Sequence, residues 1–283
     1  MLICTTKQEL HIYCRQQAAK SVLIGFVPTM GALHQGHLSL VKASQKQCSI
    51  TICSIFINPT QFNNSKDYKK YPITTEEDIE LLKEIGVDVL FLPNVKEIYP
   101  NGTTTLEMYD LGKLENLLEG HYRPGHFQGV CQVVHRLLNV VNPDMLFLGQ
   151  KDYQQCMVLK KLVTLIQKNI QVFIITTERE KSGLAMSSRN KRLSAKALEQ
   201  ASTIYKAMVN IKEKLHQQSF EILETSAKIF LLQNGFSHID YVVIADAETL
   251  EPLSKANQGQ NLIILVAAFI EEIRLIDNLP ITF

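Results

Sequence analysis

The chain has 283 residues, of which 46% are hydrophobic and 20% charged, and its formal net charge is +1. This length suits one large or two ordinary domains, and the composition is that of a soluble globular protein. A near-zero net charge argues against a dedicated nucleic-acid surface. The most apolar stretch, residues 262–270, is too short for a membrane helix, which needs about 20 residues. Because the N-terminus does not resemble a signal peptide, we expect a cytoplasmic protein without membrane or nucleic-acid partners.

Six cysteines are scattered along the chain without a CxxC pair, which gives no support to a zinc or redox motif. We expect buried, reduced thiols, as is usual in a cytoplasmic protein. A nucleophilic pair of Cys131 with His135 stays open as a less favoured alternative.

The first 180 residues alternate between apolar runs and amphipathic segments. The runs are rich in β-branched residues, which predicts strands at residues 22–27, 50–57, 87–92, 145–148 and 172–177. Apolar periodicity predicts helices at residues 74–85, 127–141 and 153–168. This alternation is typical of a parallel sheet with crossover helices, so we expect an α/β fold.

After about residue 180 the pattern changes. Two helical patterns, residues 194–217 and 219–233, precede three strand-like runs at residues 239–244, 261–268 and 272–275. This order predicts a smaller α+β domain with an antiparallel sheet. We place the boundary within residues 176–186 and expect domains of residues 1–180 and 181–283.

The most informative segment is PTMGALHQGH, residues 28–37, which lies between a predicted strand and an apolar-periodic helix. Backbone N–H groups and the dipole at a helix start attract anions. His34 and His37 add two imidazoles that can hold phosphate oxygens, while Gly31 and Gly36 allow a ligand to approach the backbone. Taken alone, so short a match is more easily explained as a capping turn with exposed imidazoles.

Further polar segments follow predicted strands, and ligands bind beyond the carboxyl ends of the strands in an open parallel sheet. Gln61, within NPTQF at 58–62, carries an amide suited to a hydroxyl-bearing carboxylate, although an ordinary Asn-Pro turn is the alternative. Residues 119–127, EGHYRPGHF, are expected to form a long polar loop. Its Arg123 can pair with phosphate or carboxylate, and a plain surface loop is equally consistent.

Two later segments combine cations with hydroxyl or carboxylate groups. In GQKDYQQ, residues 149–155, Lys151 suits a phosphate and Asp152 a ribose hydroxyl, although Asp152 can equally cap a helix. In MSSRN, residues 186–190, the two serines and Arg189 suit a mobile loop that grips phosphate near the domain boundary, with a polar linker as the alternative.

In this order, the segments PTMGALHQGH, INPTQF, GHYRPGHFQGV, NPDMLFLGQKDYQQ and MSSRN resemble the signature motifs of the pantoate–β-alanine ligase (pantothenate synthetase) family. The HxGH element is similar to the HIGH element of nucleotidylyltransferases and class I aminoacyl-tRNA synthetases, and MSSR is similar to the counterpart of their KMSKS loop. The resemblance implies a Rossmann-like N-terminal domain that binds ATP and pantoate, a small C-terminal lid domain, and a homodimer.

The resemblance also implies an AMP-forming ligase that condenses (R)-pantoate with β-alanine through a pantoyl adenylate, with ATP as substrate, Mg²⁺ as cofactor and pyrophosphate as a product. It implies catalytic roles for His37, His34 and Lys151 and a pantoate site at Gln61 and Gln155. The ATP-binding residues that it implies are Met30, Gly31, Ala32, Leu33, His34, Gln35, Gly36, His37, Gly149, Gln150, Lys151, Asp152, Glu178, Met186, Ser187, Ser188 and Arg189.

Two positions depart from the family pattern: Gln150 stands where Glu is frequent, and Gln128 where Arg is frequent. The metal ligands stay unknown, because Glu77 and Asp78 can face the phosphates but are more easily explained as N-terminal helix acids.

Pantoate's carboxylate is ionised at neutral pH, so we expect the histidines to stabilise phosphate charge rather than to act as a base. Two alternatives stay open: another HxGH nucleotidylyltransferase, and a catalytically silent nucleotide-binding module.

Overall fold

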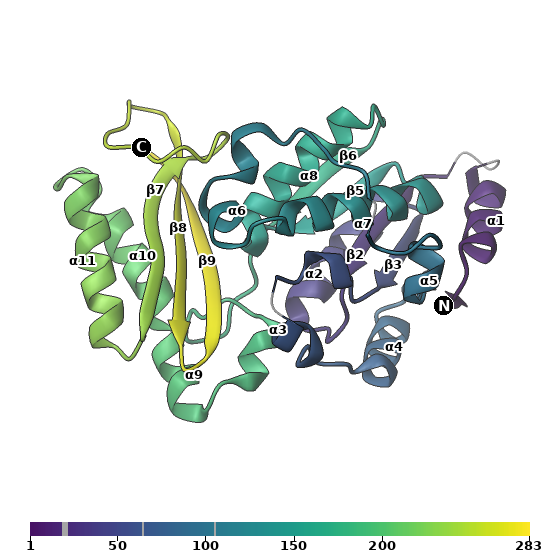
Figure 1. Ribbon diagram of the computed structural model, residues 1–283, viewed down its shortest axis with the longest axis horizontal. Helices are drawn as coiled ribbons and strands as arrows, with labels where there is room; N and C mark the ends of the chain where they lie inside the picture. Colours follow the sequence, from purple (N-terminus) through teal and green to yellow (C-terminus); the bar gives the residue numbers. More distant parts are fainter. Residues whose placement is uncertain (19–21, 64, 105) are drawn as a thin grey trace. The chain divides into compact units, whose positions relative to one another are not determined.

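The computed structural model describes residues 1–18, 22–63, 65–104 and 106–283. The chain forms two compact units, drawn in Figure 1. Unit 1 comprises Met1–Glu115, Arg123–Gly149 and Gln155–Thr176, and unit 2 comprises Asn116–Tyr122, Gln150–Gln154 and Thr177–Phe283. Two short segments from the first 154 residues are therefore part of unit 2.

Unit 1 is built on a parallel sheet, as the alternation of strands and helices predicts. Its strand order among the described residues is β1-β4-β3-β2-β5-β6. The bounds are Leu2–Cys4 for β1, Ile24–Thr29 for β2, Ile50–Ile55 for β3, Val89–Phe91 for β4, Met145–Gly149 for β5 and Gln171–Ile175 for β6. The α/β prediction for this part of the chain is confirmed.

Helices cover both faces of this sheet, because its central strands are apolar on both sides. α1 (Lys7–Ala18), α7 (His126–Val141) and α8 (Tyr153–Leu165) share a core with Phe26 and Ile52. α2 (Gln35–Gln47) and α4 (Thr75–Glu84) pack with Val27 and Cys53, which point to the other face because strand side chains alternate. The shorter helices of unit 1 are α3 (Ser65–Lys69), α5 (Val95–Ile98), η1 (Pro59–Gln61) and η2 (Gly112–Glu115).

Unit 2 is built on an antiparallel sheet of order β7-β8-β9, with bounds His238–Asp246, Asn261–Ile270 and Ile273–Thr282. α10 (Thr203–Lys214) and α11 (Phe220–Gln233) lie together on one face of this sheet (Figure 1). Alternate residues of the strands, such as Val242 and Ile264, point into the core beneath them. The remaining elements of unit 2 are α6 (Leu118–Tyr122), η3 (Gln150–Asp152), η4 (Ser188–Arg192) and α9 (Ala195–Ala201).

One predicted helix is divided in the structure, and one predicted loop is largely helical. The helix predicted for residues 194–217 is two helices, α9 and α10, which meet at Ser202. There the hydroxyls of Ser202 and Thr203 each donate to a carbonyl three residues earlier, at 2.7 Å, in place of a regular helical turn. The long loop predicted for residues 119–127 is instead occupied by α6 and the start of α7.

Other predictions miss in extent. β1 and α1 have no counterpart among the predicted elements. β9 extends to Thr282, whereas the predicted strand ended at residue 275 because the polar residues Asp277 and Asn278 interrupt the apolar pattern. The strand predicted at residues 22–27 is shifted to Ile24–Thr29 and includes Pro28. A proline is tolerated there because β2 pairs with β5 only at Gly25 and Phe26.

All six cysteines are buried, as expected, and no disulfide forms among the described residues. Burial raises the pKa of the Cys131 thiol to about 12. The Nδ1 atom of His135 lies 2.8 Å from the Tyr109 hydroxyl, and burial lowers the pKa of this histidine. This geometry disfavours the alternative of a Cys131–His135 nucleophilic pair. No helix in the described ranges combines the length and the apolarity needed to cross a membrane.

Candidate active site

Three of the predicted motifs lie at one edge of the sheet in unit 1. The strand order reverses between β2 and β5, and such a switch point is where open parallel sheets bind ligands. The HxGH segment follows the carboxyl end of β2, Gly149 ends β5, and the Asn58–Gln61 turn follows β3. The fold therefore places these segments where the sequence analysis expected a ligand.

The turn before the two histidines is held by a buried carboxylate. Gly31 and Ala32 have positive φ angles of 78° and 50°, a left-handed conformation that favours glycine. Asp78, in the first turn of α4, accepts hydrogen bonds from the amides of Ala32 and Leu33, both at 2.8 Å. Of the two acids considered as metal ligands, Asp78 is therefore a helix acid that fixes the turn, and Glu77 is exposed.

His34 and His37 form a reciprocal cap at the start of α2. The Nδ1 atom of His34 accepts from the amide of Gly36 at 3.1 Å, and the Nδ1 atom of His37 accepts from the amide of His34 at 3.3 Å. Because each Nδ1 is an acceptor, each neutral ring carries its proton on Nε2. The ring centroids are 4.1 Å apart, so the motif presents two neighbouring imidazole N–H donors at a helix start.

The backbone amides of this turn are largely occupied by protein groups. The amide of Gly31 donates to Thr29 Oγ1, and that of His37 donates to the carbonyl of His34. Together with the amides bound by Asp78 and by the imidazoles, this accounts for most of the donors that the helix start offers. The imidazole Nε2–H groups and the helix dipole, rather than the backbone N–H groups, are thus the features suited to a phosphate.

Gln61 is oriented by the side chains of Asn58 and Tyr99. Asn58 Nδ2 donates to Gln61 Oε1 at 3.1 Å, and Tyr99 donates to Asn58 Oδ1 at 2.8 Å. Gln61 Nε2 then lies 3.1 Å from the sulfur of Met30, which brings the second motif into contact with the first. The Asn58 side chain was visible in the motif, but nothing in the sequence indicates its link to Tyr99.

The motif GHYRPGHFQGV supports Gln61 through Gly129 and His126. A Cβ atom at Gly129 would lie 2.4 Å from the carbonyl oxygen of Thr60, so only glycine lets α7 approach η1 this closely. The Nδ1 of His126 donates to the Gln61 carbonyl at 2.8 Å. The start of α7 therefore fixes the backbone of Gln61, the predicted pantoate residue, and Arg123 lies half-buried just before α7.

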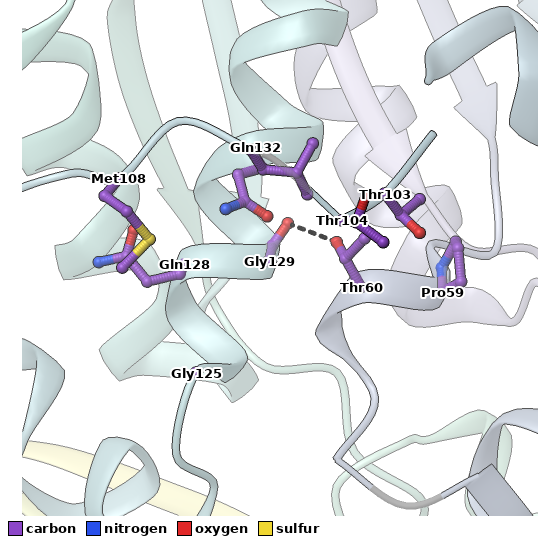
Figure 2. A pocket seen from close by; sticks show the side chains of 10 residues that line it. Pro59, Thr60, Thr103, Thr104, Met108, Gly125, Gln128, Gly129 and Gln132 are labelled. Atoms are coloured by element: carbon purple, nitrogen blue, oxygen red, sulfur yellow. Dashed lines mark hydrogen bonds between the residues drawn. The ribbon is translucent and has the colours of Figure 1, made fainter. Parts of the chain in front are cut away.

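Gln128, which stands where the family more often has Arg, fastens the 107–115 segment to α7. Its Nε2 donates to the Tyr109 carbonyl and to Glu115, and its Oε1 accepts from the Tyr109 amide. Figure 2 shows the neighbouring pocket of about 350 Å³, with Gln128 and Gln132 on one side and Thr60 on the other. None of the predicted ATP or pantoate residues lines it.

The remaining predicted nucleotide residues belong to unit 2, where β9 contacts both η3 and η4. Gln150 Nε2 donates to Asn278 Oδ1, and the carbonyls of Gln150 and Lys151 accept from Asn278 Nδ2. Lys151 is partly buried and lies 3.9 Å from the exposed carboxylate of Asp152. The departure at Gln150 thus has a structural partner in β9.

The segment leading to MSSRN folds back on itself. Glu178 accepts from the Met186 amide through its carbonyl, and its side chain is exposed. Ser187 Oγ accepts from the Arg189 amide and so begins η4, whereas Ser188 is buried. The two serines therefore differ, because Ser187 caps the turn and Ser188 packs inside.

The predicted site residues thus fall into two groups. Unit 1 holds Met30, Gly31, Ala32, Leu33, His34, Gln35, Gly36, His37, Gln61, Gly149 and Gln155. Unit 2 holds Gln150, Lys151, Asp152, Glu178, Met186, Ser187, Ser188 and Arg189. Within unit 1 a side-chain contact joins Met30 to Gln61, while Gln35 is exposed and Gln155 is half-buried on α8.

A parallel sheet with ligand-type side chains at its switch point and an anion-suited helix start defines an α/β enzyme of the nucleotide-binding class. A family model described as Pantoate-beta-alanine ligase matches residues 2–280. The chain belongs to the pantoate–β-alanine ligase family, which confirms the resemblance drawn from the motifs.

Relatives of known name agree over nearly the whole chain. The pantothenate synthetase of Cytophaga hutchinsonii is 41% identical over 283 residues and covers 99% of both chains. The crystal structure of the enzyme from Thermus thermophilus has a TM-score of 0.88 at 40% identity, again over 99% of both chains. That of the Francisella tularensis ligase, complexed with beta-gamma ATP and beta-alanine, has a TM-score of 0.82 at 39% identity, covering 99% of this chain and 97% of the other.

Proposed function

We propose that the protein joins (R)-pantoate to β-alanine at the expense of ATP, and that it does so through a pantoyl adenylate. In the first step a pantoate carboxylate oxygen bonds to the α-phosphorus of ATP, and the bond to the β-phosphate oxygen breaks to release pyrophosphate. In the second step the amine of β-alanine bonds to the acyl carbon and loses a proton, while the bond from the acyl carbon to the bridging oxygen breaks. AMP leaves with that oxygen, which came from the pantoate carboxylate. The observation that carries the proposal is the family match over residues 2–280.

The first step needs charge stabilisation rather than a base, because a carboxylate is ionised at neutral pH. We assign that role to the Nε2–H groups of His34 and His37, with Lys151 as a further phosphate ligand. The capping geometry supports the assignment, since it fixes both rings in the donor tautomer. An imidazole held this way is poorly suited to accept a proton, because Nε2 already carries one.

The remaining assignments follow the motifs. Gln61 and Gln155 would bind pantoate: Asn58 holds Gln61 Oε1 and one Nε2 hydrogen faces the Met30 sulfur, so the second Nε2 hydrogen would donate to an oxygen of the substrate. Asp152 would bind the ribose. The other ATP contacts would come from Met30–Gly36, Gly149, Gln150 and Glu178, and from Met186–Arg189 as the mobile loop over the triphosphate. Residues 1–180 would then form the substrate-binding domain and residues 181–283 the lid.

The residues that the structure describes offer no cluster that would hold Mg²⁺ through protein side chains alone. No group of three or more His, Cys, Asp or Glu side chains suited to a metal occurs among them, and both oxygens of Asp78 bind amides. We therefore keep Mg²⁺ only as the ion that accompanies ATP, which commonly binds it through phosphate oxygens and water. A cytoplasmic homodimer completes the proposal.

The test is exchange of labelled pyrophosphate into ATP, measured with pantoate, with amino acids and with nucleotide precursors. We expect exchange with pantoate alone, and formation of pantothenate and AMP once β-alanine is added. Exchange with another acid or nucleotide would favour a different HxGH nucleotidylyltransferase. Absence of exchange with every acid would favour the silent nucleotide-binding module.

A further inference from the structure

Two adjacent polar residues of β9, Asp277 and Asn278, lie between Ile276 and Leu279 and are almost completely buried, at 4% and 1% exposure. Buried polar side chains cost free energy unless they are hydrogen-bonded, so their partners reveal what they do. Each has several partners, and these partners come from two different segments of unit 2.

Asn278 holds η3. Its Nδ2 donates to the carbonyls of Gln150 and Lys151, both at 2.9 Å, and its Oδ1 accepts from Gln150 Nε2 at 3.1 Å. Both amide hydrogens and one oxygen lone pair are thus used on two consecutive residues. The backbone on either side of the Lys151 Cα is fixed in this way, and with it the direction in which the lysine leaves the turn.

Asp277 holds the segment after Glu178. Arg179 donates to the two Asp277 carboxylate oxygens at 2.6 and 3.0 Å, and it also donates to the carbonyls of Asn278 and Gly183. The Arg179 guanidinium lies 4.2 Å from the centroid of the Tyr205 ring. Burial raises the pKa of Asp277, and the charge and hydrogen bonds of Arg179, with a smaller effect of Lys151, oppose that rise.

Successive side chains of a strand point to opposite faces, so one dipeptide serves both sides of the sheet. The odd-numbered residues Ile273, Leu275 and Ile281 point toward the helices of unit 2, and Asp277 shares their parity. Asn278 has the opposite parity and reaches η3. The Asp277 carboxylate also accepts a hydrogen bond from the backbone N–H of Asn278 at 2.7 Å, which links the Arg179 contact directly to the residue that holds η3.

We propose that Asp277 and Asn278 are positioning residues that hold the Gln150–Lys151 turn and the Arg179–Gly183 segment in one fixed arrangement, and thereby set the affinity for ATP. This inference rests on the proposed function, which assigns ATP contacts to Gln150, Lys151 and Glu178. Neither residue touches the reacting atoms. They act through the two segments that they join.

The test compares Asn278→Ala and Asn278→Asp with Asn261→Ala. Asn261 is a matched control, because its side chain lies at the exposed end of β8 and accepts a hydrogen bond from Thr282. Asn278→Asp keeps the size of the side chain but turns oxygens toward the two carbonyls. We expect MgATP dissociation constants to rise about tenfold in Asn278→Ala and further in Asn278→Asp, and to stay at the wild-type value in the control.

If Asn278 only stabilised the fold, its loss would affect the KM values for ATP and for pantoate alike. We therefore measure KM for ATP and for pantoate in the pyrophosphate exchange, and expect the rise in the ATP value alone. Arg179→Lys should raise the KM for ATP as Asn278→Ala does, since lysine lacks the planar fork of arginine. In the double variant, Arg179→Lys with Asn278→Ala, the rise in the KM for ATP should be smaller than the product of the two single rises, because both changes release the same arrangement.

The outcomes separate the inference from the function on which it rests. If the wild-type protein shows pantoate-dependent exchange, and both Asn278 variants keep the wild-type dissociation constant for MgATP and the wild-type KM for ATP, the positioning role alone is overturned. Wild-type protein without pantoate-dependent exchange would overturn the proposed function, and weakened MgATP binding in the Asn278 variants by calorimetry would still support the positioning role. Should Asn278→Asp not fold, Asn278→Ala and Arg179→Lys carry the same comparison.

Discussion

The two groups of candidate nucleotide residues are held by different kinds of interaction. In unit 1 the histidine pair is held mainly by local hydrogen bonds, since His34 and His37 cap each other within four residues, and one distant contact, from Asp78 to Ala32 across 46 positions, supports the turn before them. In unit 2 the corresponding segments are held from a distance in sequence, as Asn278 binds Gln150 across 128 positions and Asp277 binds Arg179 across 98. Local motifs thus describe the first group well and the second only in part.

Unit 2 also contains a buried ionic network. Arg274 donates to both Glu119 oxygens at 2.8 and 2.6 Å and to Asp240 at 2.6 Å, and Tyr241 donates to Glu119 at 2.8 Å. Burial alone would lower the pKa of Arg274, but its bonds to Glu119 and Asp240 more than offset this and raise it. These contacts tie the Asn116–Tyr122 segment to β7 and β9.

The largest effect on stability should come from breaking this network. Glu119→Gln removes one charge of a buried pair and should lower the free energy of unfolding by about 3 kcal/mol, because Arg274 keeps an incompletely compensated charge. Chemical denaturation followed by circular dichroism measures this loss. The exposed Glu248→Gln in the same unit is the control, and equal stability of the two variants would show that the network contributes nothing.

The next effect concerns the histidine pair of unit 1. His37→Asn keeps an acceptor where Nδ1 lies, so the cap on the His34 amide persists, but the Nε2–H donor is lost. We expect adenylate formation to slow by about 100-fold at unchanged thermal stability. Single-turnover assays measure adenylation and amine capture separately. Normal adenylation with slow amine capture would contradict the charge-stabilising role, and the exposed His121→Asn is the control.

A smaller effect is expected at the carboxylate beneath that turn. Asp78→Asn replaces one acceptor by a donor that faces an amide, so it should cost about 1–3 kcal/mol of stability and reduce the exchange rate about tenfold. Thermal unfolding and pyrophosphate exchange report the two quantities. The control is Glu77→Gln at the exposed neighbouring position, which should keep the wild-type stability and exchange rate. If Asp78→Asn instead required more Mg²⁺ for exchange than the wild type does, Asp78 would be a metal ligand.

The smallest effect should come from Cys131→Ala. Burial raises the pKa of the Cys131 thiol to about 12, which favours the protonated thiol at pH 7 over the nucleophilic thiolate. We expect unchanged turnover in this variant and the same response of activity to iodoacetamide as in the wild type. A large loss of turnover in a folded variant would revive the Cys131–His135 alternative.

The sequence predicted those parts that depend on local pattern. Five strands of unit 1, all except β1, together with their parallel arrangement and the helix after HxGH, follow from apolar periodicity and capping residues, and the motifs identify the family. Gly129 appeared only as part of a motif, because its contact with Thr60 depends on tertiary packing. The roles of Tyr99, Asp277 and Asn278 were out of reach for the same reason, and the polar pair even shortened the predicted strand.

The central claim is that a pantoate carboxylate oxygen attacks the α-phosphate of ATP. Pantoate labelled with ¹⁸O in its carboxylate tests this directly when the wild-type enzyme converts it with ATP and β-alanine and the products are weighed by mass spectrometry. The account predicts one ¹⁸O atom in AMP and none in pyrophosphate. Label in an inorganic phosphate product, with none in AMP, would contradict it.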